Sequence, residues 1–234
     1  MKSPLTIGIV GGMSPESTIS YYRRIVRRHQ SEFRNHGYPR VVIASVSFQK
    51  HIDWQHQENW NRIAAELENE FHTVSKAGAD FAILATNTMH KVLPQINSPI
   101  PILNIFDAVA RYSETRGIRS VGLTGTRFTM TNGFYAEGLE KRGLKVLLPK
   151  KSEQEMIHNI IYEELIFGKV NALSAQEFDG AAQDLLKRGA DAILLGCTEL
   201  ALLVQEACTQ SEYIDSTQIH AYAAWEASIA GHLS

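Results

Sequence analysis

GADAILLGCTE, the stretch at residues 189–199, decides the fold of this 234-residue chain because it joins an apolar strand, a turn and the start of a helix. The run AILL predicts a buried strand, and the turn after it presents Cys197. The same plan occurs at residues 78–88 as GADFAILATNT. The two copies align without a gap at an offset of 111, which is 197 minus 86, so Thr86 is the counterpart of Cys197.

Strands and helices alternate on both sides of these two stretches. Residues 6–10 predict a buried parallel-type strand, followed by a glycine turn and a helix with Pro15 in its first turn. A second strand is predicted at residues 41–46. Residues 120–126 repeat the pattern of the first strand and its turn, and residues 144–149 repeat the pattern of the second strand. The second half of the chain therefore repeats the plan of the first.

This repeat predicts an α/β fold of two pseudo-symmetric domains with parallel sheets. We place the first domain at residues 1–102 plus 214–234 and the second at 103–213. Ligands of parallel sheets gather at the carboxyl ends of the strands, so we expect the active site between the domains. Four marked turns lie at such ends, namely those at Gly11, Thr86, Gly125 and Cys197.

The remaining segments of the first half are less regular. Helical periodicity covers residues 60–76, and prolines introduce a short strand at 99–103. Before the helix we expect a loop, which carries the polar residues Gln49, Lys50, His51 and Gln55. A helix is expected to start at Asn87, with His90 and Lys91 exposed to solvent in its first turn.

The composition points to a small-molecule partner. The chain has 23 Lys and Arg against 25 Asp and Glu, a net charge of −2, which argues against nucleic acid and anionic membranes as partners. No apolar run reaches the length of a membrane span, and the apolar run near Met1 is too short for a signal peptide, so we expect a cytoplasmic protein. The two cysteines, Cys197 and Cys208, do not form a Cys-x-x-Cys pair, so we expect no metal site.

Thr86 and Cys197 suggest proton transfer at a carbon atom. If the two halves face each other across a pseudo-two-fold axis, the two side chains approach one ligand from opposite sides. A thiol has a pKa of roughly 8.5, and a nearby helix N-terminus lowers it, so we expect a partly ionised Cys197. The turns would offer hydrogen-bond donors to the oxygens of an enediolate intermediate.

Ordinary structural roles compete with these functional ones. Thr86 could simply cap a helix, and the other turn residues could cap helices as well as bind a ligand. Glu199 could also tune the Cys197 thiol. We expect Asp215 and His220 to hold the final helix in place, and Cys208 to be a bystander.

Four motifs in this order resemble the cofactor-independent aspartate/glutamate racemase family: GGMS at 11–14, TNTMHK at 86–91, GTRFTM at 125–130 and GCTE at 196–199. The resemblance implies a two-domain α/β enzyme, usually a homodimer, that uses neither pyridoxal phosphate nor metal. The family places a catalytic cysteine after each of two matched strands. The second maps onto Cys197, and the first maps onto Thr86, as in a threonine-for-cysteine branch.

The resemblance thus implies an amino-acid racemase for L-aspartate- and L-glutamate-type substrates. Cys197 would abstract the α-proton, and Thr86 would serve the opposite face. Because a threonine hydroxyl is a far weaker acid than a thiol, we expect preferential action on L-amino acids. The expected substrate contacts are Met13, Ser14, Gln55, Asn87, Thr88, Thr126, Thr198 and Glu199.

Two other functions stay open. One is a single-cysteine decarboxylase of the malonate type, and the other is a non-catalytic small-molecule binder. A second substrate carboxylate would need a polar or cationic partner, for which the candidates are Arg127, Lys50, His51 and Gln55. The stricter aspartate racemases bind the second substrate carboxylate with an arginine and a lysine. That lysine would be expected near residues 162–166, which contain none.

Overall fold

The computed structural model describes residues 3–206 and 212–233, so Cys208 lies outside the described residues. The chain divides into two compact units. Unit 1 comprises Met1–Ile105 and His220–Ser234, and unit 2 comprises Phe106–Ile219. Both contain a parallel sheet with helices, which confirms the predicted α/β class with two parallel-sheet regions.

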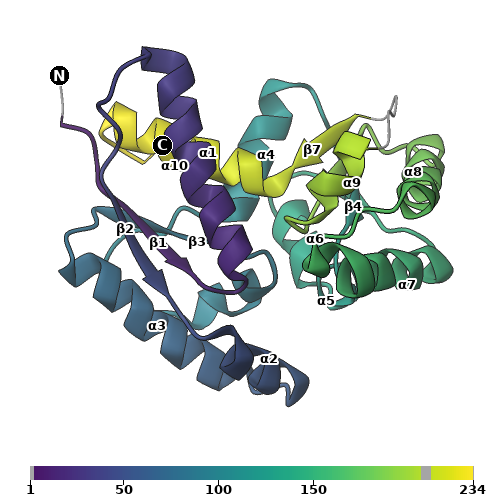
Figure 1. The fold of residues 1–234 in the computed structure, drawn as a ribbon, viewed down its shortest axis with the longest axis horizontal. Helices are drawn as coiled ribbons and strands as arrows, with labels where there is room; N and C mark the ends of the chain where they lie inside the picture. Colours follow the sequence, from purple (N-terminus) through teal and green to yellow (C-terminus); the bar gives the residue numbers. More distant parts are fainter. Residues whose placement is uncertain (1–2, 207–211, 234) are drawn as a thin grey trace. The chain divides into compact units, whose positions relative to one another are not determined.

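Unit 1 has a three-stranded parallel sheet in the order β2-β1-β3 (Figure 1). Its elements are β1 (Ile7–Gly11), α1 (Pro15–Phe33), β2 (Val41–Ser45), α2 (Phe48–His56), α3 (Trp60–Lys76), β3 (Phe81–Leu84), the 3₁₀-helix η1 (Thr88–Gln95) and most of α10 (Ser216–Ala230).

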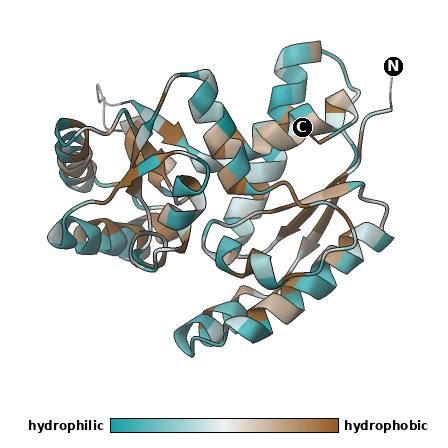
Figure 2. Cartoon of the chain, turned by 180° about the vertical axis from the view of Figure 1, so that it is seen from behind, coloured by the Kyte–Doolittle hydropathy of each residue, from teal (hydrophilic) through white to brown (hydrophobic). Residues whose placement is uncertain are grey.

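Helices cover both faces of this sheet. Apolar residues of α3 pack with Val10 and Leu84 on one face, and residues of α1 and α10 pack with Ile7 and Ile83 on the other. Figure 2 shows the same arrangement as brown strands between helices with teal outer faces. β1 and β3 are buried along their whole length, which explains why they appear in the sequence as continuous apolar runs, whereas the edge strand β2 is only partly buried.

Unit 2 has a four-stranded parallel sheet in the order β5-β4-β6-β7. Its elements are α4 (Ile105–Thr115), β4 (Ser120–Thr124), α5 (Arg127–Thr131), α6 (Phe134–Glu140), β5 (Lys145–Leu147), α7 (Lys151–Asn159), the π-helix η2 (Ile160–Glu164), the 3₁₀-helix η3 (Leu165–Phe167), α8 (Ala172–Lys187), β6 (Ala192–Leu195), α9 (Leu200–Glu206) and β7 (Tyr213–Asp215).

The two sheets repeat the same register. Ala82 of β3 forms an isolated parallel bridge with Ile102, and Ile193, its counterpart at the offset of 111, pairs with Tyr213 of β7. In unit 1 the strand expected at residues 99–103 is thus reduced to one bridge, because its prolines remove ladder donors. Since β7 pairs with β6, unit 2 extends past the expected boundary at residue 213. The boundaries of independently folding domains stay a prediction.

Gly8 and Gly122 let a helix approach each sheet closely. A Cβ atom on Gly8 would lie 3.0 Å from Val74 of α3, and one on Gly122 would lie 2.9 Å from Leu185 of α8. Val74 and Leu185 are again 111 residues apart, as 185 minus 74 shows. The repeat therefore extends to helix packing.

Two Gly-Ala-Asp turns, at residues 78–80 and 189–191, make hydrogen bonds at the amino end of each sheet. In unit 1 the backbone N–H of Thr6 donates to Oδ2 of Asp80 at 2.7 Å. In unit 2 the N–H groups of Arg119 and Ser120 donate to Oδ2 of Asp191 at 2.9 and 2.8 Å, and the Ser120 hydroxyl adds a third bond at 2.9 Å. The bond from the Arg119 N–H is the main reason why the pKa of Asp191 lies below its usual range.

Replacing Asp191 by alanine is expected to lower the free energy of unfolding by about 1 kcal/mol, because two backbone N–H groups lose a charged acceptor that water only partly replaces. Asp80→Ala, the matched variant, should cost less because it frees a single N–H group. A carboxylate whose pKa is lowered on folding stabilises the protein above its unfolded pKa of about 3.9 and loses that effect as the pH falls through its folded pKa. Urea unfolding at pH 7 and below pH 4 measures both effects. Equal losses in the two variants, or a loss in Asp191→Ala that persists at low pH, would contradict this account.

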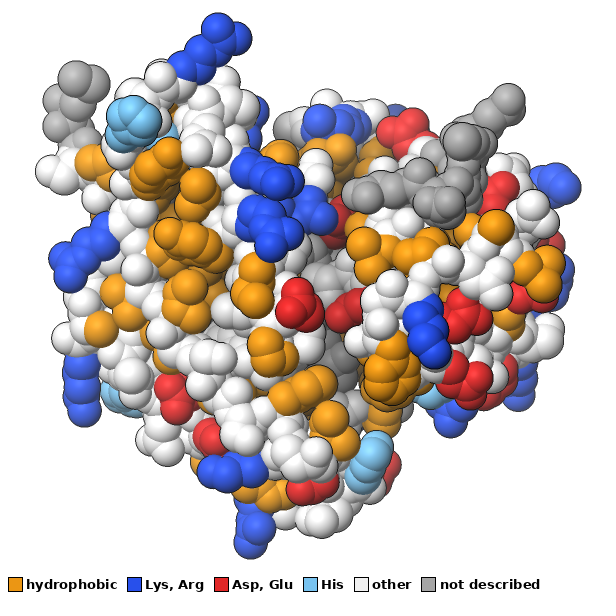
Figure 3. Space-filling model, in the orientation of Figure 1, with side chains coloured by type: hydrophobic (Ala, Val, Ile, Leu, Met, Phe, Trp, Pro, Cys, Tyr) orange, Lys and Arg blue, Asp and Glu red, His pale blue; other side chains and the backbone are white. Residues whose placement is uncertain are grey.

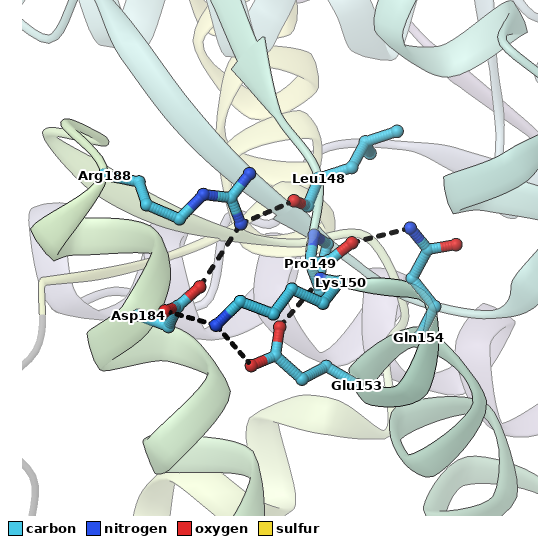
Figure 4. A network of polar contacts seen from close by, with 7 residues as sticks. All are labelled: Leu148, Pro149, Lys150, Glu153, Gln154, Asp184 and Arg188. Carbon is cyan, nitrogen blue, oxygen red and sulfur yellow. Dashed lines mark hydrogen bonds and ion pairs between the residues drawn. The ribbon is translucent and has the colours of Figure 1, made fainter.

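A network of ion pairs on unit 2 joins the start of α7 to the end of α8 (Figure 4). The ammonium group of Lys150 lies 2.7 Å from Asp184, which also pairs with Arg188 at 3.3 Å. The hydrogen bond to Asp184 raises the pKa of Lys150, and the same bond lowers the pKa of Asp184. Lys150 and Arg188 are exposed and Asp184 is half-buried, so the network orients surface side chains and adds little stability.

The segment expected as a loop at residues 49–55 is the helix α2. Its residues are mostly polar, and the helix is anchored because Phe48 and Trp54 pack against the apolar cluster under α3. The helix expected at Asn87 is a 3₁₀-helix, η1, which contains Pro94. The helix at 60–76 is confirmed as α3.

Figure 3 shows basic and acidic side chains interspersed over the face that it draws. In the part of the chain that the structure describes, no helix combines the length and the apolar character needed to cross a bilayer.

Candidate active site

Cys197 lies directly after Leu195 and Gly196, at the carboxyl end of β6. It is buried, with 9% of its surface exposed. Its Sγ donates a hydrogen bond to Oε2 of Glu199 at 3.0 Å, and the Thr198 hydroxyl donates to the same oxygen at 2.6 Å. Three consecutive residues of the GCTE motif therefore form one hydrogen-bonded group around a carboxylate.

The environment of Cys197 favours the neutral thiol. Burial raises its pKa well above the usual value, and the negative charge of Glu199 and the hydrogen bond to it raise it further. The expectation of a partly ionised thiol is therefore wrong for this state of the protein. A hydrogen bond from the backbone N–H of Glu199 lowers the pKa of Cys197, but desolvation and the carboxylate of Glu199 outweigh it. The expectation that Glu199 could tune the thiol agrees with the structure, because Glu199 raises the pKa of Cys197.

Thr86 occupies the equivalent position after β3, and 7% of its surface is exposed. Its carbonyl accepts a hydrogen bond from Nδ1 of His90 at 2.7 Å. The Thr86 hydroxyl makes no hydrogen bond to any residue in the described ranges, so it is available to a ligand. Asn87, not Thr86, holds the N-cap position of η1, and its side chain makes no capping bond there.

Asn87 is buried, whereas Thr88 is half-buried as the first residue of η1. Met13 and Ser14 lie in the turn between β1 and α1, at the same edge of the sheet as Thr86. The side chain of Met13 packs into the apolar cluster under α3. Ser14 caps α1, because its hydroxyl accepts from the N–H of Ser17 at 3.3 Å.

Ser17 is a residue of this edge that the motif analysis missed. Its hydroxyl donates to the carbonyl of Ala85 at 3.0 Å, so it links the start of α1 to the end of β3. A serine three residues after the Ser14 cap was the only signal in the sequence, and it does not indicate a bond to a strand 68 residues away.

Thr126 lies beside the Cys197 turn, because β4 and β6 are neighbours in the sheet of unit 2. Its hydroxyl caps α5 by accepting from the N–H of Thr129 at 3.4 Å. Arg127 follows, and its guanidinium pairs with Glu155 at 2.7 Å. This candidate for a second substrate carboxylate therefore already has an acidic partner.

The other candidates for that role lie on α2. Gln55 and His51 are its buried residues, with 8% and 0% of their surfaces exposed, whereas Lys50 is exposed. Nδ1 of His51 bonds to the carbonyl of Ser47 at 3.2 Å, and Nε2 has no partner among the described residues. Gln55 and His51 are four residues apart and so share one helix face.

The expectation that His90 and Lys91 are solvated is wrong for His90, which is 2% exposed. Its side chain is held on both sides by backbone groups. Lys91 is half-buried and lies over the ring of Trp60, with Nζ 4.0 Å from the ring centre. Asp215 does hold the final helix, because its carboxylate accepts from the N–H groups of Thr217 and Gln218.

Within residues 3–206 and 212–233, no cluster of three or more His, Cys, Asp or Glu side chains is placed to hold a metal ion.

The structure assembles each half of the candidate site separately. In unit 1 the turns at Ser14 and Thr86 share an edge, and in unit 2 the turns at Thr126 and Cys197 do.

The chain is thus a duplicated α/β protein with a buried thiol after one strand and a buried threonine after the equivalent strand. Residues 10–224 match the model of the Asp/Glu/Hydantoin racemase family. The chain belongs to this family, and the predicted enzyme class, an amino-acid racemase, is confirmed.

Relatives and solved structures agree with this assignment. The broad specificity amino-acid racemase RacX of Bacillus subtilis (strain 168) is 25% identical over 228 residues, covering 90% of this chain and 92% of the relative. A Yersinia pestis structure, assigned provisionally as an Asp/Glu racemase, is 36% identical with a TM-score of 0.89, covering 98% of this chain and all of that one. An aspartate racemase homologue from Pyrococcus horikoshii OT3 is 34% identical with a TM-score of 0.85, again covering 98% of this chain and 100% of the other.

Arylmalonate decarboxylase, which bears on the decarboxylase alternative, is a distant neighbour. It is 13% identical with a TM-score of 0.51, covering 95% of this chain and 92% of its own. That likeness concerns the fold alone.

Proposed function

We propose that this protein racemises amino acids of the aspartate and glutamate type without a cofactor, with Cys197 and Thr86 acting on opposite faces of the α-carbon. The observation that carries the proposal is the equivalence of the two positions. Both follow the strand that pairs with the first strand of their unit, and both are buried at its carboxyl end.

The proposed reaction moves one proton on each face. The ionised fraction of Cys197, whose thiol proton leaves through Glu199, takes the α-proton from an L-amino acid, and the electron pair enters the carboxylate to form an enediolate. Backbone N–H groups of the turns stabilise the negative oxygens. The Thr86 hydroxyl then delivers a proton to the other face, which yields the D-amino acid. The resulting alkoxide takes a proton from solvent, and the proton held by Cys197 leaves through Glu199.

The geometry around Glu199 adds a route for exchange with solvent. Its Oε2 accepts from the thiol at 3.0 Å, so the proton taken from the substrate can pass to a half-buried carboxylate and be replaced. Because Thr86 is a reluctant acid, the enediolate is often reprotonated by Cys197. The L-amino acid then returns with a solvent proton. The equilibrium constant between enantiomers is one, so kcat/KM for inversion is still equal in the two directions.

Replacing Glu199 by glutamine is expected to shift the rising limb of the pH profile for L-substrates to lower pH. The neutral amide removes a negative charge that opposes the thiolate, so the pKa of Cys197 falls. The profile of kcat/KM against pH, measured by α-proton exchange, tests this. Glu153→Gln, in a half-buried carboxylate of the Lys150 network, is the control and should leave the profile unchanged. A shift to higher pH in Glu199→Gln would contradict the assigned role.

The choice of aspartate and glutamate as substrates rests on the family description. The pairing of Arg127 with Glu155 weakens one candidate for the distal carboxylate, while the buried amide of Gln55 remains a partner for a polar side chain. A homodimer in the cytoplasm is part of the same proposal.

The test is α-proton exchange in heavy water, followed by NMR over a panel of L- and D-amino acids, with chiral chromatography for inversion. Exchange and inversion with at least one amino acid support the proposal. Release of carbon dioxide from a malonate without amino-acid exchange would favour the decarboxylase. Ligand affinity that survives in Cys197→Ala, with no turnover in the parent, would favour a binding protein.

A further inference from the structure

His90 connects the candidate catalytic threonine to Ile105, where the first of the two chain segments of unit 1 ends. Its Nδ1 lies 2.7 Å from the Thr86 carbonyl, and the backbone N–H of Ile105 points at its Nε2 at 3.3 Å. A carbonyl accepts and an N–H donates, so the ring must carry its proton on Nδ1 and keep a lone pair on Nε2. The two bonds therefore define a neutral histidine of a single tautomer, buried at 2% exposure.

A second buried histidine lies against this ring. His220 of α10 is 0% exposed, and its ring centre is 5.7 Å from that of His90 in an edge-to-face arrangement. Its Nε2–H donates to the carbonyl of Leu103 at 2.8 Å, and the Tyr21 hydroxyl donates to its Nδ1 at 2.9 Å. The segment that His90 holds at Ile105 is therefore itself fixed at Leu103 by α10 and α1.

Backbone and side-chain bonds together position the Thr86 turn: the N–H of Ala85 donates to the carbonyl of Val10 at 2.8 Å, and the N–H of Thr86 donates to the carbonyl of Leu84 at 2.9 Å. The helix that follows is a 3₁₀-helix whose N-cap side chain makes no capping bond. The carbonyls of Ala85 and Thr86 are instead held by Ser17 and His90. The Thr86 hydroxyl has no bond of its own within the described residues, so these backbone contacts set where it points.

The contact between His90 and the turn belongs to the half of the repeat that contains Thr86. The counterpart of His90 at the offset of 111 is Ala201, which has no hydrogen-bonding side chain. The Cys197 turn has Glu199 instead, bonded directly to the thiol. The two halves share a fold and a register, and they differ in the group that controls the reacting side chain.

We propose that His90 is a positioning residue that aims the Thr86 hydroxyl at the substrate and so controls inversion, but not proton abstraction by Cys197. This inference rests on the proposed function. Loss of the Nδ1–H donor releases the Thr86 carbonyl and lets the hydroxyl move, and a misplacement of about 1 Å can cost on the order of 100-fold in rate. The proton taken by Cys197 from an L-substrate still returns to the same face.

Three substitutions of His90 separate this role from a structural one. His90→Asn places an amide donor near the position of Nδ1, whereas His90→Gln places its amide near the position of Nε2. His90→Leu removes both groups. The control is His29→Leu, because His29 is also buried, at 4%, in unit 1, yet bonds to Asn35 and Trp225 and not to the Thr86 turn.

The measurement is the ratio of inversion to α-deuteration with retention, for the L-amino acid that the parent turns over fastest. We expect the ratio to fall by roughly tenfold or more in His90→Leu and His90→Gln, to recover most of the parent value in His90→Asn, and to stay unchanged in His29→Leu. If His90→Leu does not fold, the two amide variants decide. Equal ratios in both amide variants, or an equal loss of inversion and exchange, would overturn the inference while the parent remains a racemase. A parent without exchange on any amino acid would overturn the proposed function and this inference with it.

Discussion

Replacing Cys197 by alanine is expected to reduce α-proton exchange in L-amino acids by roughly 10²- to 10⁴-fold, the typical contribution of a positioned general base. The thiol is buried at the end of β6, and its hydrogen bond to Glu199 gives the abstracted proton an exit. Alanine removes both the base and the exit. Inversion should fall at least as far, because it needs the same first step from the L-side.

The control for this variant is Cys208→Ala, which removes the other cysteine of the chain. We expect it to keep the parent rate, since Cys208 lies in no motif. NMR in heavy water measures both variants against the parent. Exchange that survives in Cys197→Ala within a factor of ten would show that another group is the base, and the account would fail at its first step.

Replacing Thr86 should separate inversion from exchange. Thr86→Ala is expected to lower inversion by roughly 100-fold, because the proton donor of the second face is lost, while exchange with retention at Cys197 persists. Its effect on the free energy of unfolding should be small, because the hydroxyl makes no hydrogen bond to the described residues. Thr86→Cys should raise inversion, since a thiol is a far stronger acid than an alcohol.

Chiral chromatography and deuterium content, measured on the same samples, give the two rates. Thr73→Ala, in an exposed threonine of α3 whose hydroxyl bonds only within the helix, is the matched control and should change neither. Thr86→Cys without any gain in inversion would mean that residue 86 is not the second proton donor.

The repeat made the fold predictable, because each strand could be checked against its counterpart. Gly8 and Gly122 mark the same helix approach, and Asp80 and Asp191 accept from equivalent backbone N–H groups, those of Thr6 and Ser120. The segment at α2 was not predictable in this way. It has no apolar stripe of its own, and two aromatic anchors hold it against α3.

The chemistry of the site was only partly predictable. The positions of Cys197 and Thr86 followed from the motifs, but their state depends on where side chains point. Glu199 turns back toward the thiol and raises its pKa, which the spacing of two residues does not reveal. His90 has a polar neighbour in Lys91 and so resembled a solvated residue, yet its bonds are to Thr86 and to Ile105, fifteen residues away.

The central claim is that two unequal groups, Cys197 and Thr86, serve the two faces of one substrate. The most direct test uses the unaltered protein in heavy water, with the L- and the D-enantiomer of one substrate in separate reactions. Early in each reaction, the unreacted amino acid is recovered and its α-deuterium content is measured. Unreacted L-substrate is expected to gain deuterium faster than unreacted D-substrate, because Cys197 exchanges its proton through Glu199 and Thr86 seldom returns one. Equal rates of deuterium uptake into the two enantiomers would contradict the central claim.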